Sequence, residues 1–154
     1  MRIERLDVTS IDQARSLARK LADVPIDVLI NNAGVYNDRS RCRADDEECP
    51  GDWSVESFGK LKYSLLDTIM AVNIKGPLIV SEAFYANVKA SAQKKIVAIS
   101  SSNGTLTEHQ AYLKSYPGML ATFFTVRRMI ETIGKVTIRD SGRFLRYDGA
   151  TEPW

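Results

Sequence analysis

Two continuous apolar runs constrain the fold of this chain more than any other feature. Residues 26–30 read IDVLI and lead into NNAG, and residues 94–100 read KKIVAIS and lead into a loop of Ser, Asn and Gly. Short β-branched runs without polar alternation are typical of parallel strands that helices cover on both faces. The two runs therefore predict buried parallel strands whose carboxyl ends open onto polar loops, where ligands bind in such sheets.

A strand and a helix are predicted before the first of these runs. Residues 3–8 read IERLDV, which favours a short strand ending in Asp7 and Val8. Ser10 is a suitable N-cap, and the apolar residues after it recur at helical spacing until Pro25 breaks the pattern. The first third of the chain is thus expected to run strand, helix, strand.

Helical patterns also follow the two apolar runs. A long helix with a wide apolar face is predicted at residues 63–88, with an interruption near Gly76 and Pro77. A further helix is predicted after residue 118 with Gly134 as its stop, and residues 142–149 favour a last short strand. This alternation predicts an α/β fold with a mostly parallel sheet of about four strands in sequential order, joined by right-handed crossovers.

Length and composition set further bounds. The 154 residues suit one domain, 1–154, with an irregular loop at 35–60, and the net charge of +2 disfavours nucleic acid or an anionic membrane as partner. No apolar run approaches the roughly 18 residues of a membrane helix, and the N-terminus lacks a secretory signal, so a cytoplasmic location is expected. Cys42, Cys49 and His109 match no usual zinc spacing.

Several short motifs, in this order, resemble the short-chain dehydrogenase/reductase family. They are LDV at 6–8, NNAG at 31–34, the Val72–Asn73 pair, IVAISSSNG at 96–104, PGMLAT at 117–122 and SGRFLRYDG at 141–149. Each is weak alone, but their combination is specific, and the similarity extends over essentially the whole chain. The resemblance implies a Rossmann-like three-layer fold, here reduced to about four strands.

The resemblance also implies a cofactor, NAD or NADP. The positions that match the family's cofactor-binding residues are Asp7, Val8, Asn31, Ala33, Gly34, Pro117, Gly118 and Thr122. In the family, the first two contact the adenine, the next three line the adenosine ribose, and the last three hold the nicotinamide carboxamide. Asn32 would help to tie the strands together.

For catalysis, the resemblance implies a small carbonyl or alcohol substrate and three residues. Asn73 would belong to a proton relay, Ser101 would hydrogen-bond the substrate carbonyl, and Tyr116 lies nearest to the family's proton-donating tyrosine. The family pairs that tyrosine with a lysine four residues later, whose ammonium favours the tyrosinate. Neither Tyr112 nor Tyr116 has such a partner, since Lys114 lies two residues from each.

The Gly-rich turn TGxxxGxG, which cradles the cofactor pyrophosphate in the family, is also not found in these residues. We therefore expect an oxidoreductase-like chain that is weakly active or inactive as it stands. Asn73 could instead be purely structural, satisfied inside an apolar helix. Two alternatives remain open: a non-catalytic interaction module that pairs with a full-length relative through residues 63–88, or a product of faulty splicing or gene prediction without an independent role.

Overall fold

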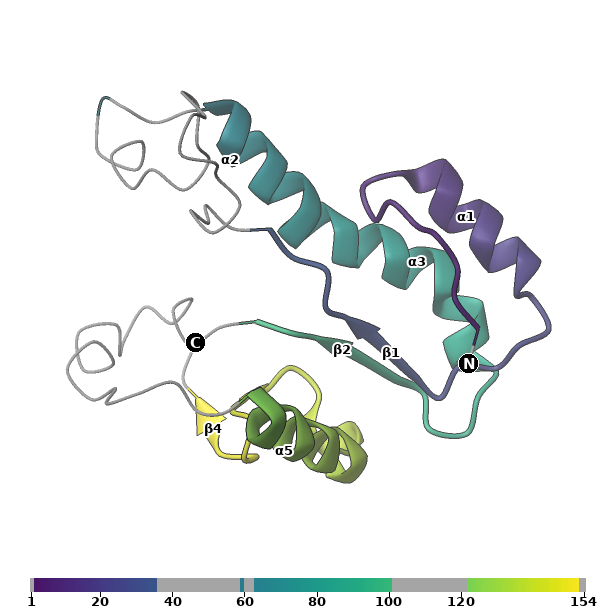
Figure 1. Ribbon diagram of the computed structural model, residues 1–154. Helices are drawn as coiled ribbons and strands as arrows, with labels where there is room; N and C mark the ends of the chain where they lie inside the picture. The colour runs from purple at the N-terminus through teal and green to yellow at the C-terminus, as the bar shows by residue number, and fades with distance from the viewer. Residues whose placement is uncertain (1, 36–58, 60–62, 101–121, 153–154) are drawn as a thin grey trace. The chain divides into compact units, whose positions relative to one another are not determined.

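The computed structural model describes residues 2–35, 59, 63–100 and 122–152 (Figure 1). The chain divides into two compact units, Met1–Ala98 and Ile99–Trp154, and each unit is considered by itself. The first unit contains most of the motifs discussed above. The second contains the C-terminal helix and hairpin.

The first unit is a parallel strand pair with a layer of helices. Its elements are α1 (Ile11–Lys20), β1 (Val28–Asn31), α2 (Tyr63–Met70), η3 (Ala71–Lys75), α3 (Gly76–Lys89) and β2 (Lys95–Ala98). Strands β1 and β2 pair in parallel, with Val28 opposite Lys95 and Asn31 opposite Ala98. Both strands predicted from the apolar runs are confirmed, and the long helix forms the connection between them (Figure 1).

Helix α1 forms where its cap and apolar spacing predicted it. The Ser10 hydroxyl accepts a hydrogen bond from the Gln13 N–H at 3.3 Å, which satisfies one of the unpaired donors of the first turn. Ala14 and Ala18, four residues apart, are the buried residues of the helix. Their small side chains let α1 lie close against α3, and the two helices form one continuous layer.

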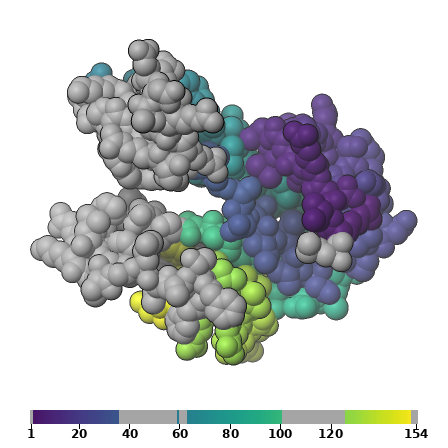
Figure 2. Space-filling model, in the orientation of Figure 1, coloured from purple at the N-terminus to yellow at the C-terminus, as the bar shows by residue number. Residues whose placement is uncertain are grey.

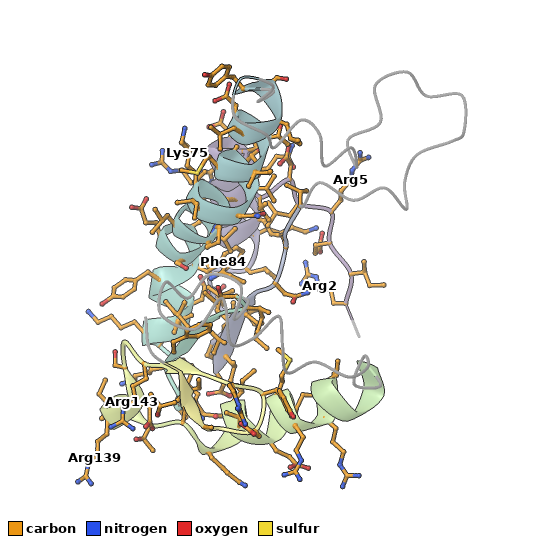
Figure 3. The ribbon with its side chains drawn as sticks, turned by 90° about the vertical axis from the view of Figure 1, so that its left-hand side faces the viewer. Arg2, Arg5, Lys75, Phe84, Arg139 and Arg143 are labelled. Carbon is orange, nitrogen blue, oxygen red and sulfur yellow. The ribbon has the colours of Figure 1, made fainter. Side chains whose placement is uncertain are left out.

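The core of this unit lies between the helices and β1. Phe84 and Val80 of α3, at 4% and 7% exposure, pack with Ala18 of α1. Partly buried apolar residues surround this cluster: Leu6, Val8, Leu17, Leu21, Ile26, Leu29 and Ala83. Figure 3 shows Phe84 within the unit, whereas Lys75 points away from the helix. In the space-filling view, the N-terminal segment and α1 form one packed body (Figure 2).

The predicted interruption of the long helix is a π-helical turn rather than a break. Residues Ala71–Lys75 are π-helical, and the Gly76 N–H donates to the Ala71 carbonyl, five residues back. Pro77 has no N–H to donate to the Asn73 carbonyl four residues earlier, so the α-helical bonding pattern cannot continue through this point. The helical ribbon from Tyr63 to Lys89 therefore stays continuous while its Asn73 turn is widened.

The predicted strand at residues 3–8 is wrong. Residues 2–7 adopt no strand, and Val8 and Thr9 form a turn. Leu6 and Val8 do pack against the core, but Ile3 is 81% exposed. The apolar pattern thus indicated that Leu6 and Val8 face the core, but a strand also needs a neighbouring strand to bond with, and the described residues offer it none.

The second unit is a helix with a small hairpin. It contains α5 (Thr122–Lys135), the short 3-10 helix η5 (Ile138–Asp140), β3 (Phe144–Leu145) and β4 (Thr151–Glu152). The Thr132 hydroxyl of α5 donates to the Tyr147 carbonyl at 3.0 Å and so ties the helix to the hairpin. Figure 3 labels Arg139 and Arg143 on this unit.

The helix predicted after residue 118 is confirmed, but it continues through Gly134 to Lys135, so the predicted stop at Gly134 is wrong. The short strand predicted within 142–149 exists as β3. However, β3 pairs with β4 in an antiparallel sheet of its own. Among the described residues the strands therefore form two separate pairs, and the expected four-stranded sequential sheet is wrong. The sequence between the hairpin strands contains Gly149 at φ 87°, which allows the tight reversal that antiparallel pairing needs.

One described helix is long and apolar enough to cross a membrane. It is the continuous ribbon Tyr63–Lys89, judged by length and composition alone. The same helix carries Phe84 and Val80 into the core against α1 and β1. The expectation that no segment approaches a membrane helix in length and apolar character is therefore wrong, and the absence of a membrane partner stays a prediction.

Candidate functional site

The candidate site lies at the carboxyl end of β1. Here the turn at Asp7 and Val8 and the loop at residues 32–35 both approach the part of the long helix that contains Asn73 and Gly76. The loop that follows β1, residues 32–35, lies against Asn73 in η3. Asn73 Oδ1 accepts from the Val35 N–H, and Asn73 Nδ2 donates to the Val35 carbonyl, both at 2.9 Å. This reciprocal pair imitates one rung of a β-ladder and satisfies all of the polar groups of Val35.

The π-helical turn sets the position of Asn73. Residues in a π-helical turn bulge from the helix, and such turns are common at functional sites. Asn73 is only half-buried, although its position in an apolar helix suggested deep burial. The requirement that its amide be satisfied is met, because Val35 uses both of its polar atoms. The structural role considered for Asn73 is therefore present, and the structure leaves its place in a proton relay untested.

Asn31 bonds to helix α3, whereas the three residues after it form an exposed loop. The Asn31 amide donates to the Ser81 hydroxyl of α3 at 3.1 Å, so its side chain lies on the helix side of β1. Asn32, Ala33 and Gly34 are exposed. In this structure Asn31 ties strand β1 to helix α3, whereas the role implied for Asn32, tying the strands together, stays a prediction.

The turn at Asp7 is held by its own side chain. Asp7 Oδ1 accepts from the Thr9 hydroxyl at 2.7 Å and from the Thr9 N–H at 2.9 Å. The hydroxyl, followed by the backbone N–H, holds the pKa of the Asp7 carboxyl below its usual value. The Asp7 N–H in turn donates to the Gln13 side chain at 2.9 Å. The carboxylate is thus fixed and ionised at neutral pH beside the first turn of α1.

Gly76 brings the Asp7 turn and the Asn73 junction together. A Cβ at Gly76 would lie 3.0 Å from Val8 Cγ2, which is closer than side chains normally pack. Gly76 is buried, so the start of α3 approaches Val8 through the absence of a side chain. Gly34 has more room, since a Cβ there would lie 3.7 Å from Asn73 Oδ1. The structure thus places Val8, Gly34 and Asn73 around one helical junction.

The described structure does not test the remaining predicted residues. Ser101, Tyr116, Pro117 and Gly118 lie outside the described residues, and Thr122 begins α5 in the second unit. Cys42, Cys49 and His109 also lie outside them. Within the part of the chain that is described, no group of three or more His, Cys, Asp or Glu side chains could hold a metal ion.

The Tyr-x-x-x-Lys spacing occurs in one place that sequence reasoning missed. Tyr85 and Lys89 are four residues apart on α3, and Tyr85 is 59% exposed. They lie at the carboxyl end of α3, near the amino ends of the strands, whereas the candidate site lies at the carboxyl end of β1. The spacing alone therefore does not identify the family's catalytic pair here.

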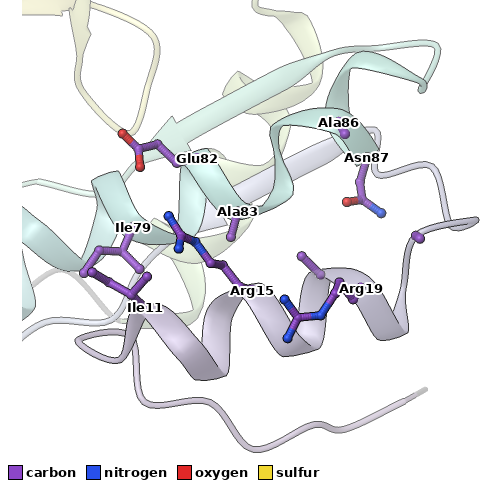
Figure 4. A pocket seen from close by; sticks show the side chains of 10 residues that line it. Ile11, Arg15, Arg19, Ile79, Glu82, Ala83, Ala86 and Asn87 are labelled. Carbon is purple, nitrogen blue, oxygen red and sulfur yellow. The ribbon is translucent and has the colours of Figure 1, made fainter.

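Two hollows adjoin the first unit. One is lined by Arg5, Leu6, Asp7 and Gln13, next to the predicted adenine-contacting turn. The other runs between α1 and α3, with Arg15 and Arg19 on one wall and Glu82 on the other (Figure 4). The second belongs to the outer face of the helix layer, so only the first adjoins predicted site residues.

Sequence reasoning also missed the partners that position the site. Ser81, Gln13 and Thr9 each bind a predicted residue, and Gly76 was recognised only as a helix interruption. Gly76 followed by Pro77 was a usable signal, because glycine allows close approach and proline removes a helical donor. Nothing in a single sequence marks Ser81 as the partner of Asn31, fifty residues away.

Comparison with known sequences gives a consistent result. The sequence model of the short chain dehydrogenase family matches residues 2–118. The chain is 24% identical over 181 residues to the C-signal protein of Myxococcus xanthus, covering 91% of this chain and 99% of that protein. It is 29% identical over 103 residues to retinol dehydrogenase 13 of Mus musculus, covering 66% of this chain but only 25% of that protein.

Solved structures agree on the fold. The NADPH-bound carbonyl reductase from chicken fatty liver superposes with a TM-score of 0.68 at 20% identity, covering 97% of this chain and 75% of that one. A Burkholderia multivorans protein described as a short-chain dehydrogenase/reductase with bound NADP gives 0.68 at 19% identity, covering 99% and 77%. The chain is therefore shorter than these structural relatives, and its fold is the Rossmann-like fold that they share.

Proposed function

The chain belongs to the short-chain dehydrogenase/reductase family, and from this premise we propose that it is an NAD(P)-dependent oxidoreductase scaffold for a small carbonyl or alcohol substrate. As this 154-residue polypeptide, it binds the cofactor weakly and turns over slowly or not at all. The observation that carries the proposal is the junction of Asn73, Val35 and Gly76 at the end of β1. This junction supports the proposal that the chain retains the part of the fold that binds a dinucleotide.

The residues of the first unit fit the adenosine half of a dinucleotide. Asp7 presents an ionised carboxylate beside a hollow, and the loop of Ala33 and Gly34 is exposed and small enough for a ribose to lie against its backbone. The likeness to NADPH- and NADP-bound proteins favours NADP over NAD as the first cofactor to test. When bound, the cofactor supplies the hydride, and the protein orients it and manages the proton.

The same residues do not fit the pyrophosphate. The 154 residues contain no Gly-x-Gly sequence, so they lack the close backbone cradle that dinucleotides receive at a helix N-terminus. Without that cradle, the two phosphates gain few hydrogen bonds, which is why weak binding is expected. The tyrosine–lysine pair is also missing after β2, so proton transfer to a substrate oxygen has no assigned donor.

Binding and turnover are tested separately. Titration of NADPH followed by its fluorescence is expected to give weak, saturable binding, and a panel of ketones is expected to give little or no NADPH oxidation. No binding at millimolar cofactor would remove the dinucleotide role. Rapid turnover would show that another group delivers the proton.

A second candidate function rests on the outer face of the long helix. Large apolar residues are exposed along it, namely Tyr63, Met70, Ile74, Leu78 and Tyr85, at 72%, 45%, 52%, 62% and 59%. Such a row supports a non-catalytic interaction module that pairs, through residues 63–88, with a second copy or a full-length relative. Co-expression with such a relative tests it, and separate elution of the two proteins from a sizing column would count against it.

Partners and location follow from the same proposals. A small-molecule substrate is proposed, with neither nucleic acid nor membrane as partner, and the proposed location is the cytoplasm. The net charge of +2 is the support for excluding nucleic acid. A fluorescent fusion of the chain that accumulates at a membrane would contradict both the location and the excluded partner.

A further inference from the structure

The Gln13 side chain makes a bond that the cap of α1 does not require. Ser10 and Gln13 have the spacing of a capping box, in which the residue at the third helical position accepts from the N–H of the N-cap residue. The Ser10 N–H instead donates to the Asp7 carbonyl at 3.0 Å. Gln13 Oε1 reaches further back along the chain and accepts from the Asp7 N–H at 2.9 Å. The side chain of Gln13 therefore serves the Asp7 turn.

The bonds around Asp7 leave only one of its polar atoms free. Its N–H donates to Gln13, its carbonyl accepts from Ser10, and its Oδ1 accepts from the hydroxyl and the N–H of Thr9. Asp7 Oδ2 bonds to no donor among the described residues. Because the backbone is fixed on both sides of Cα and the carboxyl group is fixed through Oδ1, the direction of Oδ2 is set.

Gln13 brings a hydrogen-bond donor to the same place. Asp7 and Gln13 both line the hollow that Arg5 and Leu6 complete. Gln13 Oε1 is used by the Asp7 N–H, whereas Gln13 Nε2, which has two N–H groups, bonds to no acceptor within the described part of the chain. The hollow thus presents a carboxylate oxygen that accepts and an amide nitrogen that donates, on two residues that are hydrogen-bonded to each other.

This pair of groups is complementary to adenine. Adenine presents its amine as a donor beside a ring nitrogen that accepts. A base with a carbonyl in place of the amine, such as hypoxanthine or guanine, would set an acceptor against the Asp7 carboxylate, and a polar group left without a partner costs binding free energy. A carboxylate beside an amide donor therefore distinguishes adenine from bases of that kind.

We propose that Gln13 is the positioning and base-reading residue of the adenosine site. Its Oε1 fixes the Asp7 turn, and its Nε2 donates to a ring nitrogen of adenine beside the amine that donates to Asp7 Oδ2. The inference rests on the proposed dinucleotide function and deepens it, because it assigns base selectivity to a residue of α1. Since Gln13 and Thr9 fix the Asp7 turn through bonds within the chain, little ordering is left to oppose binding of the base.

Substitution of Gln13 leaves the cap of α1 in place. The Ser10 hydroxyl accepts from the backbone N–H of residue 13, at 3.3 Å, and any residue other than proline retains this donor. A change of side chain at position 13 therefore alters the bond to Asp7 and the free amide, while helix α1 keeps its first turn. A purely structural role for Gln13 would leave the choice between bases unchanged.

The base preference of the full chain is the first test. Binding of NADPH and of its hypoxanthine analogue is followed by nicotinamide fluorescence, and NADPH is expected to bind at least about tenfold more tightly. Gln13→Met removes both polar atoms at similar length and is expected to reduce this preference to about threefold or less. Gln93→Met makes the same change at an exposed glutamine of the loop between α3 and β2 and should retain the preference.

The outcomes separate this inference from the proposed function. If NADPH binds but the hypoxanthine analogue binds equally well, or if Gln13→Met keeps the preference, base reading through Gln13 is overturned while the dinucleotide function stands. If NADPH does not bind at millimolar concentration, both are overturned.

Gln13→Glu separates the two tasks of the side chain. Glutamate keeps an oxygen for the Asp7 N–H but replaces the amide donor with a second acceptor. Amide exchange at Asp7 should therefore stay as in the wild type in Gln13→Glu and become faster in Gln13→Met, while NADPH affinity falls by about tenfold in both. Unchanged NADPH affinity in Gln13→Glu would overturn the contact with the base, and unchanged Asp7 exchange in Gln13→Met would overturn the positioning role.

Discussion

The two ends of the unit formed by β1 and α3 are built differently. At each end, an asparagine of the long helix hydrogen-bonds to a neighbouring segment. At the amino end of β1, Asn87 is 4% exposed, and its amide donates to the Leu21 carbonyl at 2.6 Å and the Val24 carbonyl at 3.0 Å. The backbone carbonyl of Asn87 accepts from the Ile26 N–H at 3.1 Å. This end is closed.

At the carboxyl end of β1, Asn73 is half-buried and holds Val35 alone. The loop of Asn32, Ala33 and Gly34 beside it is exposed. An asparagine of the long helix thus bonds to three backbone groups at the closed end, those of Leu21, Val24 and Ile26, but to one residue, Val35, at the open end. The closed end thus buries the polar groups of its asparagine, whereas the open end leaves the backbone of Asn32, Ala33 and Gly34 exposed.

The largest effect is expected at the closed end. Asn87→Ala leaves the Val24 carbonyl without its Asn87 donor and the Leu21 carbonyl with only the Val24 N–H, which should lower the free energy of unfolding by about 2–3 kcal/mol. Urea denaturation measures the change, with Ala86→Ser on the same turn as the control. A loss below about 0.5 kcal/mol, the usual range of surface substitutions, would remove Asn87 from its role.

The loop between α3 and β2 should come next. Asp27 Oδ1 accepts from the Ala92 N–H at 3.1 Å and the Gln93 N–H at 3.0 Å, which fixes the chain reversal at the closed end. Asp27→Ala is expected to cost about 1–2 kcal/mol in urea denaturation, because both N–H groups lose a charged acceptor. Asp27→Asn retains an acceptor oxygen and should recover at least half. Equal losses in the two variants would sink this interpretation.

At the open end, the effect on stability should be smaller and local. Asn73→Ala is expected to lower the free energy of unfolding by about 1 kcal/mol, because water can replace the amide at Val35. The sharper readout is amide exchange, where Val35 should exchange faster while Ile26 does not change. Asn73→Asp keeps the oxygen that accepts from the Val35 N–H but sets a second acceptor against the Val35 carbonyl, so it should restore only part of the protection. Faster exchange at both ends would erase the distinction between them.

The smallest effect concerns the pH dependence of the Asp7 turn. Hydrogen bonds from Thr9 lower the Asp7 pKa, so the stabilisation is present above the unfolded pKa and is lost as pH falls through the folded value. Thr9→Ala removes the hydroxyl and should raise the Asp7 pKa toward its ordinary value, whereas Thr9→Ser should not. Carboxyl ¹³C titration measures it. An unchanged Asp7 pKa in Thr9→Ala would contradict the assignment.

Much of the first unit could be predicted from the sequence because its signals are local. The apolar runs gave β1 and β2, Ser10 gave the start of α1, and Asn73 had to be satisfied somewhere. The pattern at residues 3–8 failed because burial of Leu6 and Val8 needs only a core, whereas a strand needs a partner. Pairing between β3 and β4 depended on a two-residue strand too short to recognise.

The site was predictable only in part for a similar reason. Motif order placed Val8, Gly34 and Asn73 in the same region, and the structure brings them to one junction. The contacts that hold them depend on distant partners such as Ser81, which carry no mark in a single sequence. The spacing of Tyr85 and Lys89 shows the converse, since a correct spacing on the wrong element gives no site.

The claim that the open end of β1 binds the dinucleotide is tested most directly by mapping NADPH onto the backbone amides of the full chain by NMR. The account predicts shifts at Val8, Gly34 and Val35 that grow with NADPH concentration, with the amides of Ile26 and Asn87 unchanged. Shifts confined to the Asn87 end, or no shifts at millimolar NADPH, would contradict it.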